Sequence, residues 1–89
     1  MKYSVEYSKG AIKDLKKLDR YTQTLILGWI EKNLIGCENP RAFGKGLTAN
    51  RSGQWRYRIG DYRLITEIYD DKIVILVLNV GHRREVYDN

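Results

Sequence analysis

The chain is 89 residues long, carries a formal net charge of +5 at pH 7 and has 43% hydrophobic residues. This length accommodates one domain, and we interpret residues 1–89 as a single domain. Cys37 is the only cysteine and His82 the only histidine, which excludes an internal disulfide and leaves a structural zinc site short of ligands. We therefore expect a cytoplasmic protein without metal or cofactor. The sequence has neither an apolar run of about 18 residues, as a membrane span requires, nor the apolar leader of a signal peptide.

The first half of the chain predicts one strand followed by two helices. Residues 2–7 alternate between apolar and polar side chains, which is typical of a strand with one buried face. Ser8 is a favourable N-cap for an amphipathic helix over 9–18, and Asp19 is suited to cap a second helix from about 20 to 34. Helices joined this closely form a helical hairpin.

The second half predicts a loop and then a meander of three strands. The segment 36–53 is rich in glycine and polar residues, which indicates a loop. A strand follows, whose buried face would carry Trp55, Tyr57 and Ile59. Segments 62–69 and 73–80 are rich in strand-forming residues and complete the meander. The order strand, two helices, three strands indicates an α+β fold, with an antiparallel sheet and the helices packed on one face.

Two arginines on the first strand of the meander are not explained by composition. Arg56 and Arg58 share the face opposite the aromatic residues, and Arg63 comes just after the next turn. Arginines that converge on one sheet face repel each other unless an anion lies between them. The alternative is an exposed face that only solubilises the protein. Lys45 and Arg51 belong to the same basic stretch, so we predict that they bind an anionic substrate together with the arginine pair.

The end of the chain carries the second candidate group. Residues 80–87 directly follow an apolar strand and read Val-Gly-His-Arg-Arg-Glu-Val-Tyr. Histidine is the side chain that exchanges protons most readily near neutral pH, although a lone histidine such as His82 is more often structural than catalytic. Tyr87 is suited either to anchor the end of the chain or to stack on an unpaired RNA base.

These motifs resemble a known family. The stretch 54–65, which reads Gln-Trp-Arg-Tyr-Arg-Ile-Gly-Asp-Tyr-Arg-Leu-Ile, and the stretch 80–87 resemble the RelE branch of the RelE/ParE toxin superfamily. The predicted helix with the sequence Ala-Ile-Lys-Asp-Leu-Lys-Lys-Leu and the step Asn39-Pro40-Arg41 are similar too. The resemblance spans essentially the whole chain, and it implies an antiparallel sheet with a helical hairpin on one face.

The resemblance also implies an activity. Toxins of this kind cleave messenger RNA in the ribosomal A site, without a metal, by attack of a ribose 2′-OH on the adjacent phosphate. Arg56 and Arg58 match positions that contact the scissile region, and Arg63 matches an arginine that stabilises the transition-state phosphate. Arg83 matches a second basic contact, and Tyr87 matches a tyrosine that stacks on or orients a base.

One departure from the family pattern bears on proton transfer. Some relatives have lysines where this chain has Arg56 and Arg58, and an arginine effectively never gives up its proton, so neither is a general base. His82, Glu85 and Tyr87 remain as candidates, and our hypothesis is that His82 is the acid or base. Alternatively, the ribosome supplies most of the rate enhancement by positioning the RNA, in which case free RNA is a poor substrate.

A toxin of this kind implies a partner. The resemblance predicts a RelB-like antitoxin that covers the basic groove in a hetero-oligomer, and displacement of residues 82–89 is one possible route of inhibition. The main competing function is a ParE-like inhibitor of DNA gyrase with no nuclease activity, because fold alone does not fix function. A third is an RNA-binding module without catalysis. The combination of the predicted arginines with Tyr87 favours the nuclease, whose substrate is mRNA and whose further partner is the ribosome.

Overall fold

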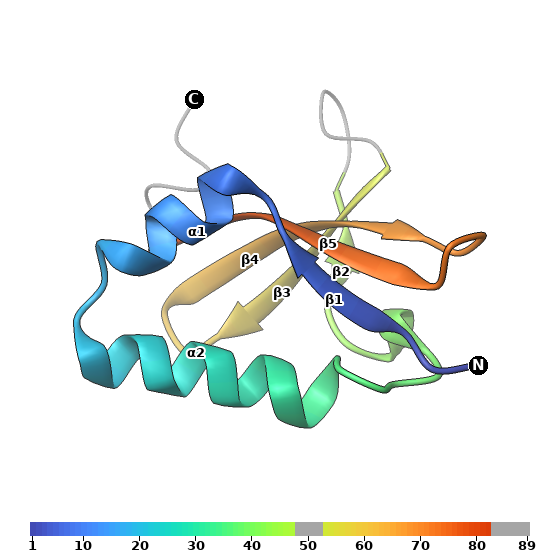
Figure 1. The fold of residues 1–89 in the computed structure, drawn as a ribbon, viewed down its shortest axis with the longest axis horizontal. Coiled ribbons are helices and arrows are strands. Elements are labelled where there is room, and N and C mark those ends of the chain that lie inside the picture. Colours follow the sequence, from blue (N-terminus) through green and yellow to red (C-terminus); the bar gives the residue numbers. More distant parts are fainter. Residues whose placement is uncertain (48–52, 83–89) are drawn as a thin grey trace.

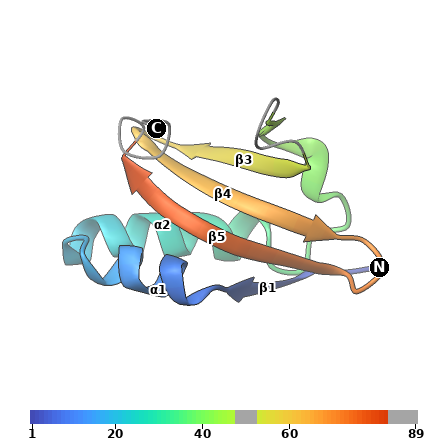
Figure 2. The ribbon, with the colours of Figure 1, turned by 90° about the horizontal axis from the view of Figure 1, so that it is seen from above.

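Two helices cover one face of a five-stranded sheet (Figures 1 and 2). The computed structural model of the chain describes residues 1–47 and 53–82. Its elements are, in chain order, β1 (Ser4–Tyr7), α1 (Lys9–Lys16), α2 (Arg20–Asn33), the short 3₁₀ helix η1 (Pro40–Ala42), β2 (Lys45–Gly46), β3 (Gln54–Ile59), β4 (Tyr62–Tyr69) and β5 (Val74–His82). None of the described helices is long and apolar enough to span a membrane.

Both helices begin where the sequence predicted. The Ser8 hydroxyl accepts a hydrogen bond from the amide of Ala11 (3.0 Å) and caps α1. The Asp19 carboxylate caps α2 by accepting hydrogen bonds from the amide of Thr22 (3.2 Å) and from its hydroxyl (2.6 Å). These caps satisfy amide groups that have no partner within the helix, so the predicted helical hairpin is confirmed.

The predicted α+β class is confirmed, but the sheet is mixed and not wholly antiparallel. The strand order is β1-β5-β4-β3-β2, and β1 runs parallel to β5, with Ser4 opposite Val74. The other three pairs of neighbouring strands are antiparallel. Alternation along β1 predicts a strand. It does not predict whether this strand runs parallel or antiparallel to a partner segment about 70 residues away. The predicted loop 36–53 also contains η1 and β2.

A β-bulge interrupts the pairing of β4 with β5. Ile65 pairs with Asn79 and Thr66 pairs with Val77, so Leu78 is an extra residue in β5. The N-cap residue of α1 and one side chain within α1 bond the backbone at the bulge and just after it. The Ser8 hydroxyl donates to the Leu78 carbonyl (3.0 Å), and the Val80 amide donates to the Asp14 carboxylate (3.0 Å). These bonds fix α1 against β5.

The hydrophobic core lies between the sheet and the two helices. The helices contribute Ala11, Ile26 and Ile30, and the residue after α2 adds Leu34. The sheet contributes Tyr57, Ile59, Leu64, Ile75, Val77 and Val80. All of these side chains are buried. Because neighbouring residues of a strand point to opposite faces, the residues between them on β3 and β4 point away from the helices.

Candidate nucleic-acid interface

Four basic side chains share the sheet face that points away from the helices. Arg58 on β3 lies directly opposite Arg63 on β4, and Lys45 on β2 lies directly opposite Arg56 on β3. Directly opposed residues of antiparallel strands point to the same face, and like charges in that arrangement destabilise a sheet. Two such pairs side by side are typical of a surface that binds an anion. We call these four residues the basic face.

Arg63 occupies the most enclosed position of the basic face. Its side chain is only 4% exposed, whereas Arg58 is exposed and Arg56 is partly buried. Its neighbour on β5 is Gly81, which has no side chain beside the guanidinium. One Nη of Arg63 also makes a long contact with the Tyr62 carbonyl (3.4 Å). A charge away from bulk water acts more strongly on a nearby anion than an exposed one does.

A pocket of about 400 Å³ adjoins the basic face. Its lining joins α2, the end of the η1 segment, β2 and β3, and consists of Trp29, Phe43, Gly44, Lys45, Arg56 and Arg58. Three of the four residues predicted to bind substrate therefore meet at one pocket, which we call the edge pocket. The Trp29 side chain packs against the core while also lining the pocket.

At Gly44 the backbone of the loop before β2 packs directly against the backbone of β3. Its φ is +81°, and a Cβ at this position would lie 2.1 Å from the Arg56 carbonyl oxygen. Only glycine fits such a close approach of two backbones. The carbonyl of the preceding residue, Phe43, accepts a hydrogen bond from the Trp55 indole (2.7 Å). Phe43 is a site residue that sequence reasoning missed, and the signal that would have found it is an aromatic residue directly before a glycine in a polar loop.

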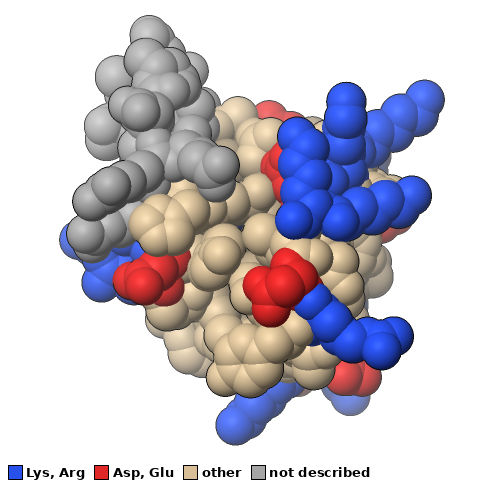
Figure 3. All heavy atoms as spheres, turned by 90° about the vertical axis from the view of Figure 1, so that its left-hand side faces the viewer, with Lys and Arg blue, Asp and Glu red and all other residues tan. Residues whose placement is uncertain are grey.

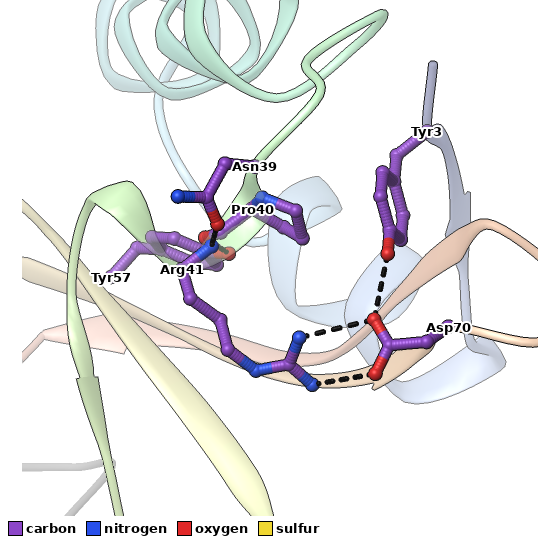
Figure 4. Close-up of polar contacts among 6 residues, drawn as sticks. All are labelled: Tyr3, Asn39, Pro40, Arg41, Tyr57 and Asp70. Atoms are coloured by element: carbon purple, nitrogen blue, oxygen red, sulfur yellow. Dashed lines mark hydrogen bonds and ion pairs between the residues drawn. The ribbon is translucent and has the colours of Figure 1, made fainter. Parts of the chain in front are cut away.

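A second polar network holds the η1 segment near β1 and the turn after β4 (Figure 4). The Arg41 guanidinium donates two hydrogen bonds to the Asp70 carboxylate (3.0 and 3.1 Å), and the Tyr3 hydroxyl donates a third (2.6 Å). The bonds from Arg41, followed by that from Tyr3, lower the pKa of Asp70. Arg41 belongs to the basic stretch of the sequence, but its guanidinium is engaged within the fold.

Tyr57, a core residue of β3, also contacts the η1 segment. Its buried hydroxyl donates to the Pro40 carbonyl (2.5 Å), and burial raises the pKa of Tyr57. The Asn39 side chain caps η1 by accepting from the amide of Arg41 (3.1 Å). Hydrogen bonds to the carbonyls of Pro40 and Phe43 therefore fix the segment that leads into β2.

The structure does not bring His82 to the basic face. His82 is the last residue of β5 and lies opposite Tyr62, with ring centroids 5.7 Å apart and nearly perpendicular planes. Its neighbour Gly81 lies opposite Arg63, so the His82 side chain points to the opposite side of the sheet. Arg51, together with Arg83, Glu85 and Tyr87 from the end of the chain, lies outside the described residues.

A separate group of basic side chains lies on the helical side of the molecule. Figure 3 shows lysine and arginine side chains gathered there, with uncharged surface beside them. Exposed lysines at α1 and its C-cap are Lys9, Lys13, Lys16 and Lys17. They belong to a different element from the edge pocket, so they provide charge-matched control positions.

Comparison with known proteins gives consistent matches over nearly the whole chain. Residues 5–87 match the family described as ParE toxin of type II toxin–antitoxin system, parDE. Toxin RelG of Mycobacterium tuberculosis is 30% identical over 87 residues, which cover 98% of this chain and 98% of that protein. A putative RelE-like toxin protein of Escherichia coli is 28% identical over 91 residues, covering 99% of this chain and 93% of the relative.

Solved structures give the same picture. A chain of the toxin–antitoxin complex RelBE2 from Mycobacterium tuberculosis superimposes with a TM-score of 0.85 at 29% identity, and the match covers 93% of each chain. The isolated RelE toxin of Escherichia coli matches with a TM-score of 0.71 at 26% identity, over 96% of this chain and 90% of that one. The fold and the sequence therefore indicate the same relatives.

Proposed function

The chain belongs to the RelE/ParE toxin family of type II toxin–antitoxin systems, and we propose that it is a ribosome-dependent, metal-independent endoribonuclease that cleaves messenger RNA in the A site. The observation that best supports this proposal is the basic face, where Arg58 lies opposite the enclosed Arg63 beside the edge pocket. Such an arrangement suits a phosphodiester, which carries one negative charge and several acceptor oxygens.

In the proposed reaction, a ribose 2′-OH attacks the phosphorus of the adjacent phosphodiester. The O2′–P bond forms and the P–O5′ bond breaks, so the products are a 2′,3′-cyclic phosphate and a 5′-OH. Negative charge builds up on the non-bridging oxygens during this step, and preorganised donors that meet it lower the barrier. Arg63 is the proposed transition-state contact, while Arg56, Arg58 and Lys45 bind the flanking backbone.

Two protons must move in this reaction, one from the 2′-OH and one to the leaving O5′. Arginine is unsuited to either transfer, and His82 is the proposed acid or base. Its ring lies against Tyr62 on the other side of the sheet, so this role requires a change in backbone conformation at the end of β5. Arg83 and Tyr87 complete the proposed site as a second phosphate contact and a base-stacking side chain, and Arg51 adds a substrate contact.

The proposed partner is a RelB-like antitoxin that forms a hetero-oligomer with the toxin in the cytoplasm. A relative at 29% identity was solved in a toxin–antitoxin complex, which supports an antitoxin for this chain. Electrostatic complementarity would draw an acidic segment of such a partner to the basic face.

The test is primer extension on a defined message in a translating extract, with purified toxin and with or without ribosomes. We expect breaks inside codons only when ribosomes are present, and we expect Arg63→Ala to lower the cleavage rate about 10²- to 10³-fold, the effect of losing one preorganised donor. Lys13→Gln removes a positive charge from α1 and serves as the control. Thermal unfolding of each variant shows that the fold is retained.

The second candidate is a ParE-like inhibitor of DNA gyrase with no nuclease activity, which the family description favours. The same experiment separates the two functions. Growth arrest on expression without breaks in the message, under either condition, would reject the nuclease, and a gyrase supercoiling assay would then follow.

A further inference from the structure

We propose that Phe43 and Trp29 form a stacking subsite for one unpaired base of RNA, and that the phosphates next to this base bind Lys45, Arg56 and Arg58. The inference rests on the proposed function for the class of ligand, which is single-stranded RNA. It adds a base-binding position at the edge pocket, away from the end of the chain.

The aromatic pair is packed from within and open on the outside. The rings of Trp29 and Phe43 lie with centroids 6.0 Å apart and planes at 72°. Trp29 also contacts Tyr57 at 5.6 Å, which ties it to the core. Phe43 is 46% exposed. Because the two rings are nearly perpendicular, they leave ring faces that the other ring does not cover, and such a face is what a base needs for stacking.

Phe43 is also held in place before any ligand arrives. Its carbonyl accepts a hydrogen bond from the Trp55 indole, and the next residue, Gly44, is pressed against the Arg56 carbonyl. A large apolar side chain that is both exposed and fixed loses little conformational entropy when a ligand binds. This arrangement distinguishes Phe43 from an apolar residue that is exposed by chance.

The surrounding charges identify the ligand. Lys45, Arg56 and Arg58 line the same pocket as the two rings, so the site offers aromatic faces and cations within one small volume. A nucleotide supplies both complementary parts, an aromatic base and a phosphate, and proteins bind single strands with this combination. The pocket volume of about 400 Å³ also falls within the usual size range of small-ligand sites.

The test uses an RNA trinucleotide whose central base is the fluorescent analogue 2-aminopurine, titrated with the whole purified protein at low salt. Stacking on an aromatic ring quenches this fluorophore. We expect quenching with the parent protein and with Phe43→Tyr. With Phe43→Ala we expect an affinity at least about 5-fold weaker, the lower end of base–aromatic stacking, and little quenching at saturation.

Leu27→Ala is the matched control, because Leu27 on α2 is 42% exposed and lines a different pocket that includes neither Phe43 nor Trp29. We expect this variant to quench the trinucleotide as the parent does. Three results would overturn the inference: no binding of the trinucleotide, binding without quenching, or equal quenching by Phe43→Ala.

The two proposals can fail separately. Quenching that depends on Phe43, with no cleavage of messages on ribosomes, would retain the stacking subsite and reject the nuclease. Cleavage on ribosomes with no dependence of RNA quenching on Phe43 would retain the nuclease and reject the subsite.

Discussion

Arg58 and Arg63 lie directly opposite each other on β3 and β4, on the sheet face that points away from the helices. Like charges in this position repel, so we expect Arg58→Gln to raise the free energy of unfolding by about 0.2–1 kcal/mol. The same substitution removes a charged contact to phosphate and should slow message cleavage about 10- to 100-fold, the equivalent of about 1.5–3 kcal/mol. Urea unfolding and ribosome-dependent cleavage measure the two effects.

The two effects of Arg58→Gln have opposite signs, because the fold becomes more stable while cleavage becomes slower. Lys13→Gln removes the same charge from α1 and should change neither quantity by a comparable amount. A variant at Arg58 that loses stability and activity together would instead indicate that this arginine supports the fold.

The close backbone contact at Gly44 predicts that even an added methyl group destabilises the fold. Alanine there must adopt a φ near +81° and place its Cβ against the Arg56 carbonyl. We expect Gly44→Ala to lower the free energy of unfolding by about 1–3 kcal/mol. We also expect it to weaken RNA binding, because Phe43 and Lys45 would shift. Thermal unfolding and the trinucleotide titration measure these effects.

Gly28→Ala is the control for this substitution. Gly28 lies within α2, and a Cβ at that position would have no heavy atom within 4 Å. Alanine is the better helix former, so this variant should gain about 0.5–1 kcal/mol. If both alanine variants lost stability equally, the close approach at Gly44 would not be the cause.

Local patterns in the sequence predicted much of this fold. Both helix caps, Ser8 and Asp19, are confirmed, and β4 begins and ends at the predicted residues. The shared face of Arg56 and Arg58 is confirmed as well, because alternation along a single strand determines it. The parallel direction of β1 was not predictable in this way, since it depends on a partner about 70 residues away.

The face that His82 occupies shows why part of the site was not predictable. Ile75 and Val77 point into the core, and strict alternation from them would turn His82 away from the helices, toward the basic face. The extra residue Leu78 reverses the alternation, so that Val80 is in the core and His82 pairs with Tyr62. A single bulge, fixed by contacts with α1, thus decides which face the only histidine occupies.

Asp70 gives a prediction for pH. Its pKa is lowered in the folded protein by the hydrogen bonds from Arg41 and then Tyr3, so its ionised form stabilises the fold above the pKa of about 3.9 of an unfolded aspartate. This contribution is lost as the pH falls through the lower folded value. We expect Asp70→Asn to be less stable than the parent at pH 7, with a difference that shrinks below about pH 4.

Urea unfolding at pH 7, 5 and 3 measures this difference. Asp71→Asn, one position further along the same turn, removes an equal charge and is the matched control. A constant difference between Asp70→Asn and the parent at all three values would show that the carboxylate charge does not act through Arg41.

The proposed proton transfer by His82 gives the last prediction. If a backbone change at the end of β5 brings His82 from Tyr62 to the scissile phosphate, His82→Gln should lower the cleavage rate about 10²- to 10⁴-fold, the range for a positioned acid or base. Tyr62→Phe keeps the ring next to His82 and serves as the control for packing. A rate for His82→Gln within twofold of the parent would mean that the basic face and the ribosome carry catalysis without this histidine.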